Sequence, residues 1–279
     1  SAQTLQLSLD ELHGRLRFAG HFTVKEGSPM SKWYTGERRD LARLAGLVDP
    51  AAAFVAMSSC NPQVQARSAL EWMDSVAESM PENVRELIDL ERRVWREMLP
   101  KTGGMNAVSI DLSVDGLKGL SYIEALEPQA LIESVRSFLA APELAKFGMQ
   151  LEGPTAREIE GTTWSEYRMA LDVETFARAF DPDVQVPASD KADADHAIAA
   201  FLGEGGLRLG VAASNGFLVM RVNGDDNFAR RAIARLGGSR TSLGSGLDDA
   251  LADARFAQTA YVAQIDIGRV LNQISDLAA

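Results

Sequence analysis

The sequence predicts an α+β fold, in which a largely antiparallel, hairpin-built sheet carries helices packed on one face. Short segments that alternate apolar and polar residues are joined by turn residues, as at Ser214-Asn215-Gly216, and this pattern is typical of β-hairpins. Longer segments with apolar residues three or four positions apart, as in residues 63–99, are typical of amphipathic helices. Because helical segments repeatedly follow strands, the sequence indicates a sheet with helices packed against it.

The N-terminal part of the chain predicts short elements. Residues 5–9 and 14–24 alternate apolar with polar side chains and predict a pair of strands. Residues 37–47 contain leucines three positions apart and predict a short helix. The apolar residues 51–57 predict a further strand.

A long helical tract then covers residues 63–99. Pro81 divides it into two helices, because an interior proline lacks the amide hydrogen and clashes with the preceding turn. Residues 108–112 and 117–125 predict a hairpin, and the segment after Glu127 predicts a helix that ends near residue 139.

The second half repeats this alternation. The predicted strands cover residues 158–161, 166–171, 207–213, 216–222 and 261–265. The predicted helices cover residues 173–180, 193–202, 227–236, 247–253 and 267–277. The repetition favours two related α+β halves, residues 1–150 and 151–279, which are either separate units or one continuous domain.

Short oxygen-bearing residues stand between several predicted strands and the helices that follow them. A side-chain oxygen at such a position accepts free amide hydrogens of the first helical turn, and its charge suits the helix dipole. We therefore interpret these acidic residues as helix starts rather than as catalytic groups. They are Glu127, Asp172, Asp225 and Asp266.

The composition indicates a globular protein with an acidic surface. The 279 residues are 46% hydrophobic and 24% charged, and the formal net charge is -11. Such a charge repels phosphate backbones and anionic lipids, so a nucleic-acid partner is not expected. No apolar run reaches the ~18–20 residues of a membrane helix, so no membrane-spanning segment is expected in this chain. The lone cysteine, Cys60, cannot form an internal disulfide.

No motif predicts catalysis, and no cofactor is expected. The glycine-rich segments Gly203–Gly206 and 244–246 do not lie directly between a strand and a helix, as a dinucleotide-binding loop requires. Residues 58–60 resemble a nucleophile turn, but they lack its glycine frame and precede Pro62. We therefore interpret Cys60 as an inert thiol, because nothing in the sequence activates it beyond a predicted helix start nearby.

Histidines and paired acids have ordinary structural explanations, and no metal site is predicted. His13 and His21 could face each other across the first strand pair, but no third ligand accompanies them, and His196 stands far along the chain. The pairs Asp225-Asp226 and Asp248-Asp249 stand at predicted helix starts, where a negative charge is favourable.

One aromatic pair, Trp33 and Tyr34, lies on a predicted loop after residues 27–29. If these side chains are exposed, they form a recognition patch for a partner. Packing of the loop onto the core is the alternative, because large aromatic side chains are usually buried.

The C-terminal tract resembles a known group of sequences. Its strand residues 216–222, its helix and Gly-Gly stop at 225–238, its Ser242-Leu243 pair and its final segment 261–271 are similar to a widespread group of bacterial secreted or lipoprotein-like proteins, known only as a domain of unknown function. Residues 27–33 and 41–57 resemble the opening of that group. The resemblance implies a mixed α/β fold and an extracytoplasmic location, and it implies no activity or catalytic residue.

We therefore expect a non-enzymatic binding or interaction protein of the cell envelope, periplasmic or secreted, whose partner is an unknown protein or a small hydrophobic ligand. A carrier of a hydrophobic small molecule or lipid is the first alternative, because a concave sheet covered by helices at 63–80 and 129–139 could enclose an apolar pocket. A hydrolase is the second alternative. It would require His21, an acidic residue and a serine in one cleft.

Overall fold

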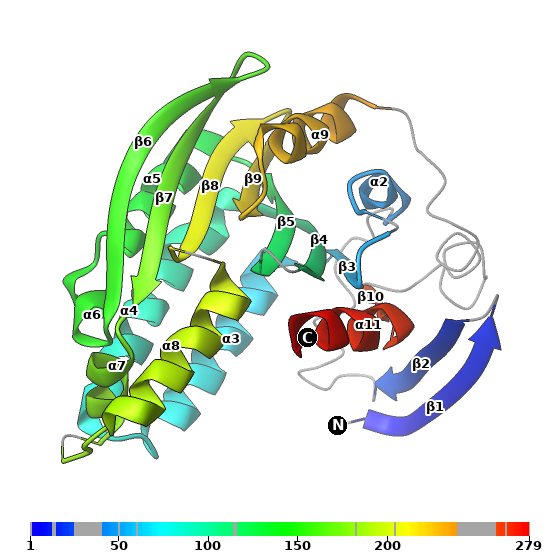
Figure 1. The fold of residues 1–279 in the computed structure, drawn as a ribbon. Coiled ribbons are helices and arrows are strands. Elements are labelled where there is room, and N and C mark those ends of the chain that lie inside the picture. The colour runs from blue at the N-terminus through cyan, green and yellow to red at the C-terminus, as the bar shows by residue number, and fades with distance from the viewer. Residues whose placement is uncertain are drawn as a thin grey trace.

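The structure, a computed structural model, describes residues 2–12, 15–24, 41–49, 51–59, 61–113, 116–181, 183–203, 205–238, 261–265 and 267–278. In these ranges the chain alternates strands with helices (Figure 1). The elements in chain order are β1 (Ala2–Leu12), β2 (Arg15–Val24), α2 (Ala42–Ala45), β3 (Phe54–Ser59), α3 (Pro62–Ala77), α4 (Glu82–Met98), η1 (Leu99–Lys101), β4 (Thr102–Ser113), β5 (Gly116–Ala125), α5 (Pro128–Leu139), α6 (Pro142–Lys146), β6 (Met149–Ile159), β7 (Thr162–Leu171), α7 (Val173–Phe180), α8 (Ala188–Leu202), β8 (Leu207–Ser214), β9 (Phe217–Val222), α9 (Asp226–Gly237), β10 (Tyr261–Ile265) and α11 (Ile267–Ala278).

Eight of the strands form one sheet in the order β10-β3-β4-β5-β9-β8-β7-β6. Every neighbouring pair in this sheet is antiparallel. The strands β1 and β2 form a separate antiparallel pair. The predicted α+β class, with a largely antiparallel sheet built from hairpins, is therefore confirmed.

The strand order is symmetrical about the central β5–β9 pair. In the first half, β3 leads through α3 and α4 to β4, β5 and α5. In the second half, β7 leads through α7 and α8 to β8, β9 and α9. The two series approach the sheet centre from opposite edges, which is the repeated order that the sequence suggested. The predicted boundary between residues 150 and 151 falls inside β6, and strands from both halves share one sheet.

Helices cover both faces of the sheet, which corrects the expected one-sided arrangement. On the first face, α9 and the segment around α2 pack against buried residues of β3, β4 and β5. Tyr122 of this core donates its hydroxyl hydrogen to the carbonyl of Ala232 in α9, at 3.1 Å. Burial raises the pKa of Tyr122 to about 12, so this donor keeps its proton at neutral pH.

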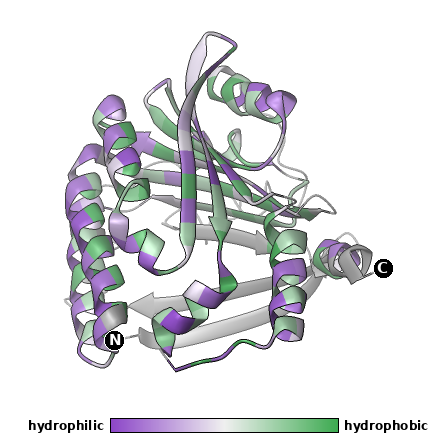
Figure 2. Cartoon of the chain, turned by 60° about the vertical axis from the view of Figure 1, so that its left-hand side comes forward, coloured by the Kyte–Doolittle hydropathy of each residue, from purple (hydrophilic) through white to green (hydrophobic). Residues whose placement is uncertain are grey.

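The second face carries α5, whose side chains Leu131, Ile132 and Val135 are buried against β8 and β9. The apolar residues form one buried cluster on each face of the sheet. Two neighbouring residues of β9 point to opposite faces, since Val219 belongs to the cluster on the first face and Leu218 to that on the second. Figure 2 shows hydrophobic residues along the central strands and a mixture of hydrophobic and hydrophilic residues along the helices. The alternation of period two therefore gives this sheet two buried faces, each of which needs a helical cover.

Several local predictions are confirmed. Asn215 and Gly216 have φ values of 48° and 77°, as the two-residue hairpin between β8 and β9 requires. The long helical tract is divided at Pro81, with α3 before it and α4 after it. The carboxylates of Asp172 and Asp225 accept amide hydrogens at the starts of α7 and α9. Glu127 makes no such bond, so its predicted capping role is wrong.

The strands predicted at residues 158–161 and 166–171 have other bounds in the structure, where β6 and β7 form a hairpin. The turn lies at Glu160 and Gly161, and β6 extends back to Met149. Most side chains of β6 are exposed because it is an edge strand, so it lacks the apolar alternation that identifies a half-buried strand. The predicted strand at 51–57 is shifted to Phe54–Ser59. The predicted helix at 247–253 and the proposed cap Asp266 lie outside the described residues.

Candidate interaction surface

The helix α7 presents an apolar stripe that remains partly exposed. The helix begins after Asp172, whose carboxylate accepts the amide hydrogen of Thr175 at 2.7 Å. This hydrogen bond lowers the pKa of Asp172, so the cap is ionised at neutral pH. Phe176 and Phe180 lie one turn apart with exposed fractions of 37% and 48%, and no residue of α7 is buried. The apolar side chains that would normally pack α7 against the protein are therefore partly exposed to solvent.

The two phenylalanines are held at the surface by ring contacts. The ring centroids of Phe176 and Phe180 are 5.1 Å apart. Phe180 also meets the buried Phe147 edge-on, with a centroid distance of 6.1 Å. Such contacts fix ring orientation and add to apolar burial. We call the exposed pair Phe176 and Phe180 the aromatic edge.

A groove with a volume of about 530 Å³ is lined by residues of α4 and α6. Both helices contact α7, which lies beside them in Figure 1. Lys146 lines this groove, and the next residue, Phe147, contacts the aromatic edge. All lining residues except one proline are charged. We call this the charged groove, and it is lined by Glu86, Asp89, Arg92, Arg93, Arg96, Pro142, Glu143 and Lys146.

Most charges in the groove belong to ion pairs that join helices. Arg92 contacts Asp89 within α4 and Asp74 in α3, both at 2.7 Å. Arg93 of α4 pairs with Glu143 of α6. The backbone amide of Glu143 and the guanidinium of Arg93 lower the pKa of the Glu143 carboxyl.

Of the other two cations in the groove, Lys146 forms an ion pair and Arg96 does not. Lys146 of α6 pairs with Glu86 of α4, and this hydrogen bond raises the pKa of Lys146. Arg96 is exposed on α4, and no ion pair joins it to another residue of the described ranges. Among the described residues, the groove therefore contains one arginine without an ion pair.

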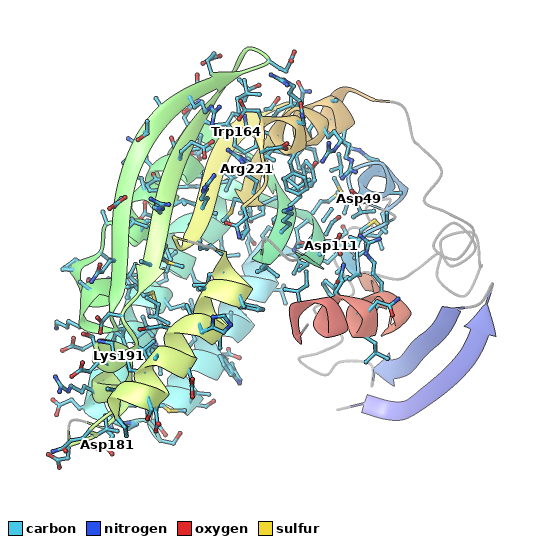
Figure 3. All side chains as sticks on the ribbon, in the orientation of Figure 1. Asp49, Asp111, Trp164, Asp181, Lys191 and Arg221 are labelled. Carbon is cyan, nitrogen blue, oxygen red and sulfur yellow. The ribbon has the colours of Figure 1, made fainter. Side chains whose placement is uncertain are left out.

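A buried ionic pair lies on the first face of the sheet (Figure 3). Arg221 of β9 contacts Glu166 of β7 at 2.6 Å, although β8 lies between them. The strand β8 supplies Gly210 at this position, and a Cβ atom there would stand 2.7 Å from Arg221 Nε. The guanidinium also lies 5.4 Å from the ring centroid of Trp164. These contacts join β9 to β7 across β8, so we assign the pair a structural role.

Ser134, Lys101 and Glu97 form a second polar cluster, between α5 and the end of α4. The Ser134 hydroxyl oxygen lies 2.7 Å from Lys101 Nζ and 2.7 Å from Glu97 Oε1. Ser134 is also 2.9 Å from the carbonyl of Ala130, and its side chain is buried. The hydrogen bonds from Ser134 and Lys101 lower the pKa of Glu97. The cluster joins two helices, and its hydroxyl is committed to these contacts.

Two aspartates anchor helices to the sheet on the first face (Figure 3). Asp49 accepts a hydrogen bond from Arg235 of α9 at 2.9 Å, and Ser109 Oγ accepts its amide hydrogen at 2.7 Å. Asp111 of β4 accepts two hydrogen bonds from Arg269 of α11, at 3.0 and 2.6 Å. These carboxylates therefore position α9 and α11.

Only some of the candidate residues from the sequence analysis lie within the described ranges. Trp33 and Tyr34, the expected recognition patch, lie outside the described residues, as do Cys60 and His13. His196 is exposed on α8. Within the described ranges there is no group of three or more His, Cys, Asp and Glu residues that could hold a metal ion. None of the helices in those ranges is both long and apolar enough to cross a bilayer.

The sequence interpretation missed the aromatic edge and the charged groove. The spacing of Phe176 and Phe180 indicates a helix, but it does not show which side of the helix stays exposed. The groove combines α4 with α6, and its two ion pairs between these helices join residues that are 50 and 60 positions apart. Only the charge-rich sequence of α4 could have drawn attention to it.

The fold and this surface define a two-sided α+β protein with an exposed aromatic edge beside a charged groove. Comparison of the chain with protein-family models, curated proteins and solved structures found no match.

Proposed function

We propose that this protein is a non-catalytic interaction protein that binds a protein partner through the aromatic edge and the adjoining charged groove. The observation that carries the proposal is the exposure of Phe176 and Phe180 on an amphipathic helix without a single buried residue. Interfaces are enriched in aromatic residues and arginine, and charged residues typically surround the apolar contact. A partner that covers the aromatic edge would bury apolar area that now faces water.

The surrounding contacts support this proposal. Glu174 of α7 forms ion pairs with Arg178 of the same helix at 2.6 Å and with Lys191 of α8 at 3.4 Å. The pair with Lys191 joins α7 to α8 through polar atoms, so this contact does not use the phenylalanines. The helix α8 also has no buried residue.

The test is affinity capture of partners from lysate of the source cells, with the double variant Phe176→Ser/Phe180→Ser. Phe201→Ser is the matched control, because Phe201 is an exposed phenylalanine on α8. We expect a stable partner with wild type and with the control, and at least a tenfold loss with the double variant, by analogy with aromatic hot spots. Equal capture by all three proteins would refute the proposal. Melting curves verify that each variant is folded.

We also propose that this function is exercised at the cell envelope. The support is the resemblance of residues 216–271 to bacterial secreted or lipoprotein-like sequences. Fractionation of the source cells with an antibody against the protein tests it. Recovery in the envelope or periplasmic fraction is expected, and recovery only in the cytosol contradicts it.

A second candidate function is a carrier of a hydrophobic small molecule or lipid. On the second face of the sheet, Phe54, Ile110, Gly119 and Val222 form one cross-strand row. Phe54, Ile110 and Val222 are only half-buried, although the row runs through the sheet centre. Native mass spectrometry of the purified protein should then show a bound apolar molecule, and a spectrum of the ligand-free mass alone would remove this candidate.

A further inference from the structure

The segment that contains α7 and α8, residues 172–202, is strongly acidic. It carries seven carboxylates and only two cations, Arg178 and Lys191. Asp172 caps α7, and Glu174 pairs with both cations. Within the described ranges the other five carboxylates form no ion pair, and all of them are exposed. They are Asp181, Asp183, Asp190, Asp193 and Asp195.

The aromatic edge belongs to this acidic segment. Asp181 follows Phe180 directly in the chain and stands at the end of α7. At the other end of the same helix, Glu174 pairs with Lys191, so the first turn of α8, which contains Asp190, lies beside α7. Figure 3 shows Asp181 and Lys191 at the same end of the molecule. The exposed rings are therefore surrounded by carboxylates from both helices.

The aromatic edge also lies at the acidic end of the charged groove. Phe147 contacts Phe180 edge-on and follows Lys146, whose charge is paired with Glu86 near the start of α4. The arginines of the groove begin six residues further along α4, which is about 9 Å at a helical rise of about 1.5 Å per residue. The aromatic edge is therefore separated from the basic end of the groove.

The charge of this surface selects among possible occupants of the aromatic edge. Exposed charges act over about 8 Å at physiological ionic strength, so Asp181 affects any group that covers the neighbouring ring. Acidic segments and anionic lipid surfaces are repelled by such carboxylates. Lysine and arginine are attracted, and their cations can also lie over the faces of aromatic rings. Apolar side chains are required as well, because only they bury the exposed ring area.

We propose that the aromatic edge binds a basic segment of the partner protein, one that carries aromatic or aliphatic residues among its lysines or arginines. This inference rests on the proposed interaction function and names the chemistry of its partner. The apolar side chains of the segment cover Phe176 and Phe180, and its cations face the carboxylates of Asp181 and Asp183. Complementary charge then steers the partner to this end of the molecule and disfavours acidic competitors.

The test measures fluorescence anisotropy of a rhodamine-labelled peptide in which lysines alternate with phenylalanine and glycine. The protein variants are Asp183→Lys and the matched control Glu127→Lys, which changes the net charge equally. Glu127 is exposed, accepts no amide hydrogen of α5 and lies beside Lys101, beyond the opposite end of α4. We expect Asp183→Lys to weaken binding about fivefold and Glu127→Lys to leave it within about twofold, since the local charge decides the contact.

Two further measurements examine the apolar part of the contact. The Phe176→Ser/Phe180→Ser variant should bind the basic peptide at least tenfold more weakly than wild type, by analogy with aromatic hot spots. A peptide with glutamates in place of the lysines should not bind. Melting curves verify that each variant is folded.

Equal effects of Asp183→Lys and Glu127→Lys, or the absence of binding by the basic peptide, would overturn this inference. Unchanged binding by the phenylalanine variant would overturn it too, because the contact would then be electrostatic alone. Phosphatidylcholine vesicles that sediment with wild type but not with that variant would assign the aromatic edge to lipid instead. If the phenylalanine variant loses the captured partner while Asp183→Lys keeps it, the interaction function stands and the basic-segment assignment fails.

Discussion

One rung of the sheet shows how differently the two halves solve the same packing problem. The rung runs through cross-strand neighbours on the first face, and its members from β3 to β7 are Val55, Ser109, Leu120, Arg221, Gly210 and Glu166. In the first half, Val55 and Leu120 are buried apolar residues. At the equivalent strands of the second half, the rung contains the ionic pair of Arg221 and Glu166.

The comparison of the Arg221–Glu166 pair with Val55 and Leu120 shows that a buried charge has stricter geometric requirements than a buried apolar side chain. The side chain of Arg221 has an exposed fraction of 4%, and its Nη1 also donates to the carbonyl of Gly224 at 2.8 Å. It can reach Glu166 only because Gly210 leaves the space above β8 empty. An apolar pair needs suitable volume, whereas a buried ion pair also needs partners at fixed distances.

Removal of the Glu166 charge should destabilise the protein by leaving Arg221 without its ion-pair partner. We expect Glu166→Gln to lower the free energy of unfolding by about 3 kcal/mol, because Arg221 is left buried without its counter-ion. Urea denaturation followed by circular dichroism measures this loss. An unchanged midpoint would show that the pair does not support the sheet.

A double variant sharpens the same comparison. Arg221→Leu combined with Glu166→Val gives the second half the apolar chemistry of Leu120 and Val55. Because replacement of a buried ion pair by apolar residues is often neutral, we expect the double variant to recover at least half of the loss caused by Glu166→Gln. A double variant less stable than the single one would mean that the space over Gly210 accepts only the guanidinium.

The helical pairs inserted between equivalent strands differ as well. The pair α3–α4 contributes the buried residues Met73 and Leu90. The pair α7–α8 contributes none. We expect Leu90→Ala to cost about 2–3 kcal/mol through cavity formation, whereas Ile198→Ala in α8 costs about 1 kcal/mol or less. Urea midpoints of the two variants measure the difference, and equal losses would show that α8 is packed as firmly as α4.

The first helix of each pair is capped by a different residue. Asn61 accepts amide hydrogens at the start of α3, and Asp172 does so at the start of α7. Asp172→Ala should therefore lower stability by about 1 kcal/mol, whereas Asp172→Asn, which copies the first half, should leave it within about 0.5 kcal/mol at pH 7. Thermal unfolding at neutral pH distinguishes the two changes.

The pH dependence of stability also distinguishes an aspartate cap from an asparagine cap at the start of α7. Folding lowers the pKa of Asp172, so its contribution to stability is complete above the pKa of the unfolded chain, about 3.9, and is lost as the pH falls through the lower folded value. Asparagine does not titrate in this range. Below about pH 4, wild type should therefore lose stability relative to Asp172→Asn. Parallel stability profiles down to pH 2 would contradict this.

Local signals in the sequence predicted the elements whose causes are local. The hairpin at Asn215-Gly216 follows from the φ values that these two residues tolerate, and the break at Pro81 follows from the missing amide hydrogen. Asp172 and Asp225 were recognised as helix starts because capping involves residues three positions apart. Glu127 occupies a similar position, but its side chain accepts no amide hydrogen of the helix, because position alone does not determine the side-chain direction.

The candidate site could not be predicted in the same way. Arg93 and Glu143 are 50 residues apart, and Arg221 and Glu166 are 55 residues apart. No spacing rule connects such partners, because sheet order and helix placement bring them together. The two-sided cover of the sheet was missed for the same reason, since a strand such as β9, buried on both faces, does not indicate which helix will lie on either one.

The sequence by itself determined the α+β class, the hairpins and the helix breaks, because turn chemistry, capping and hydrophobic periodicity act over a few neighbouring residues. Tertiary structure alone decided that α9 and α5 lie on opposite faces, that Gly210 makes room for Arg221, and that Phe176 stays exposed. These outcomes depend on which surfaces meet once the whole sheet is assembled, and burial is a property of that assembly rather than of any segment.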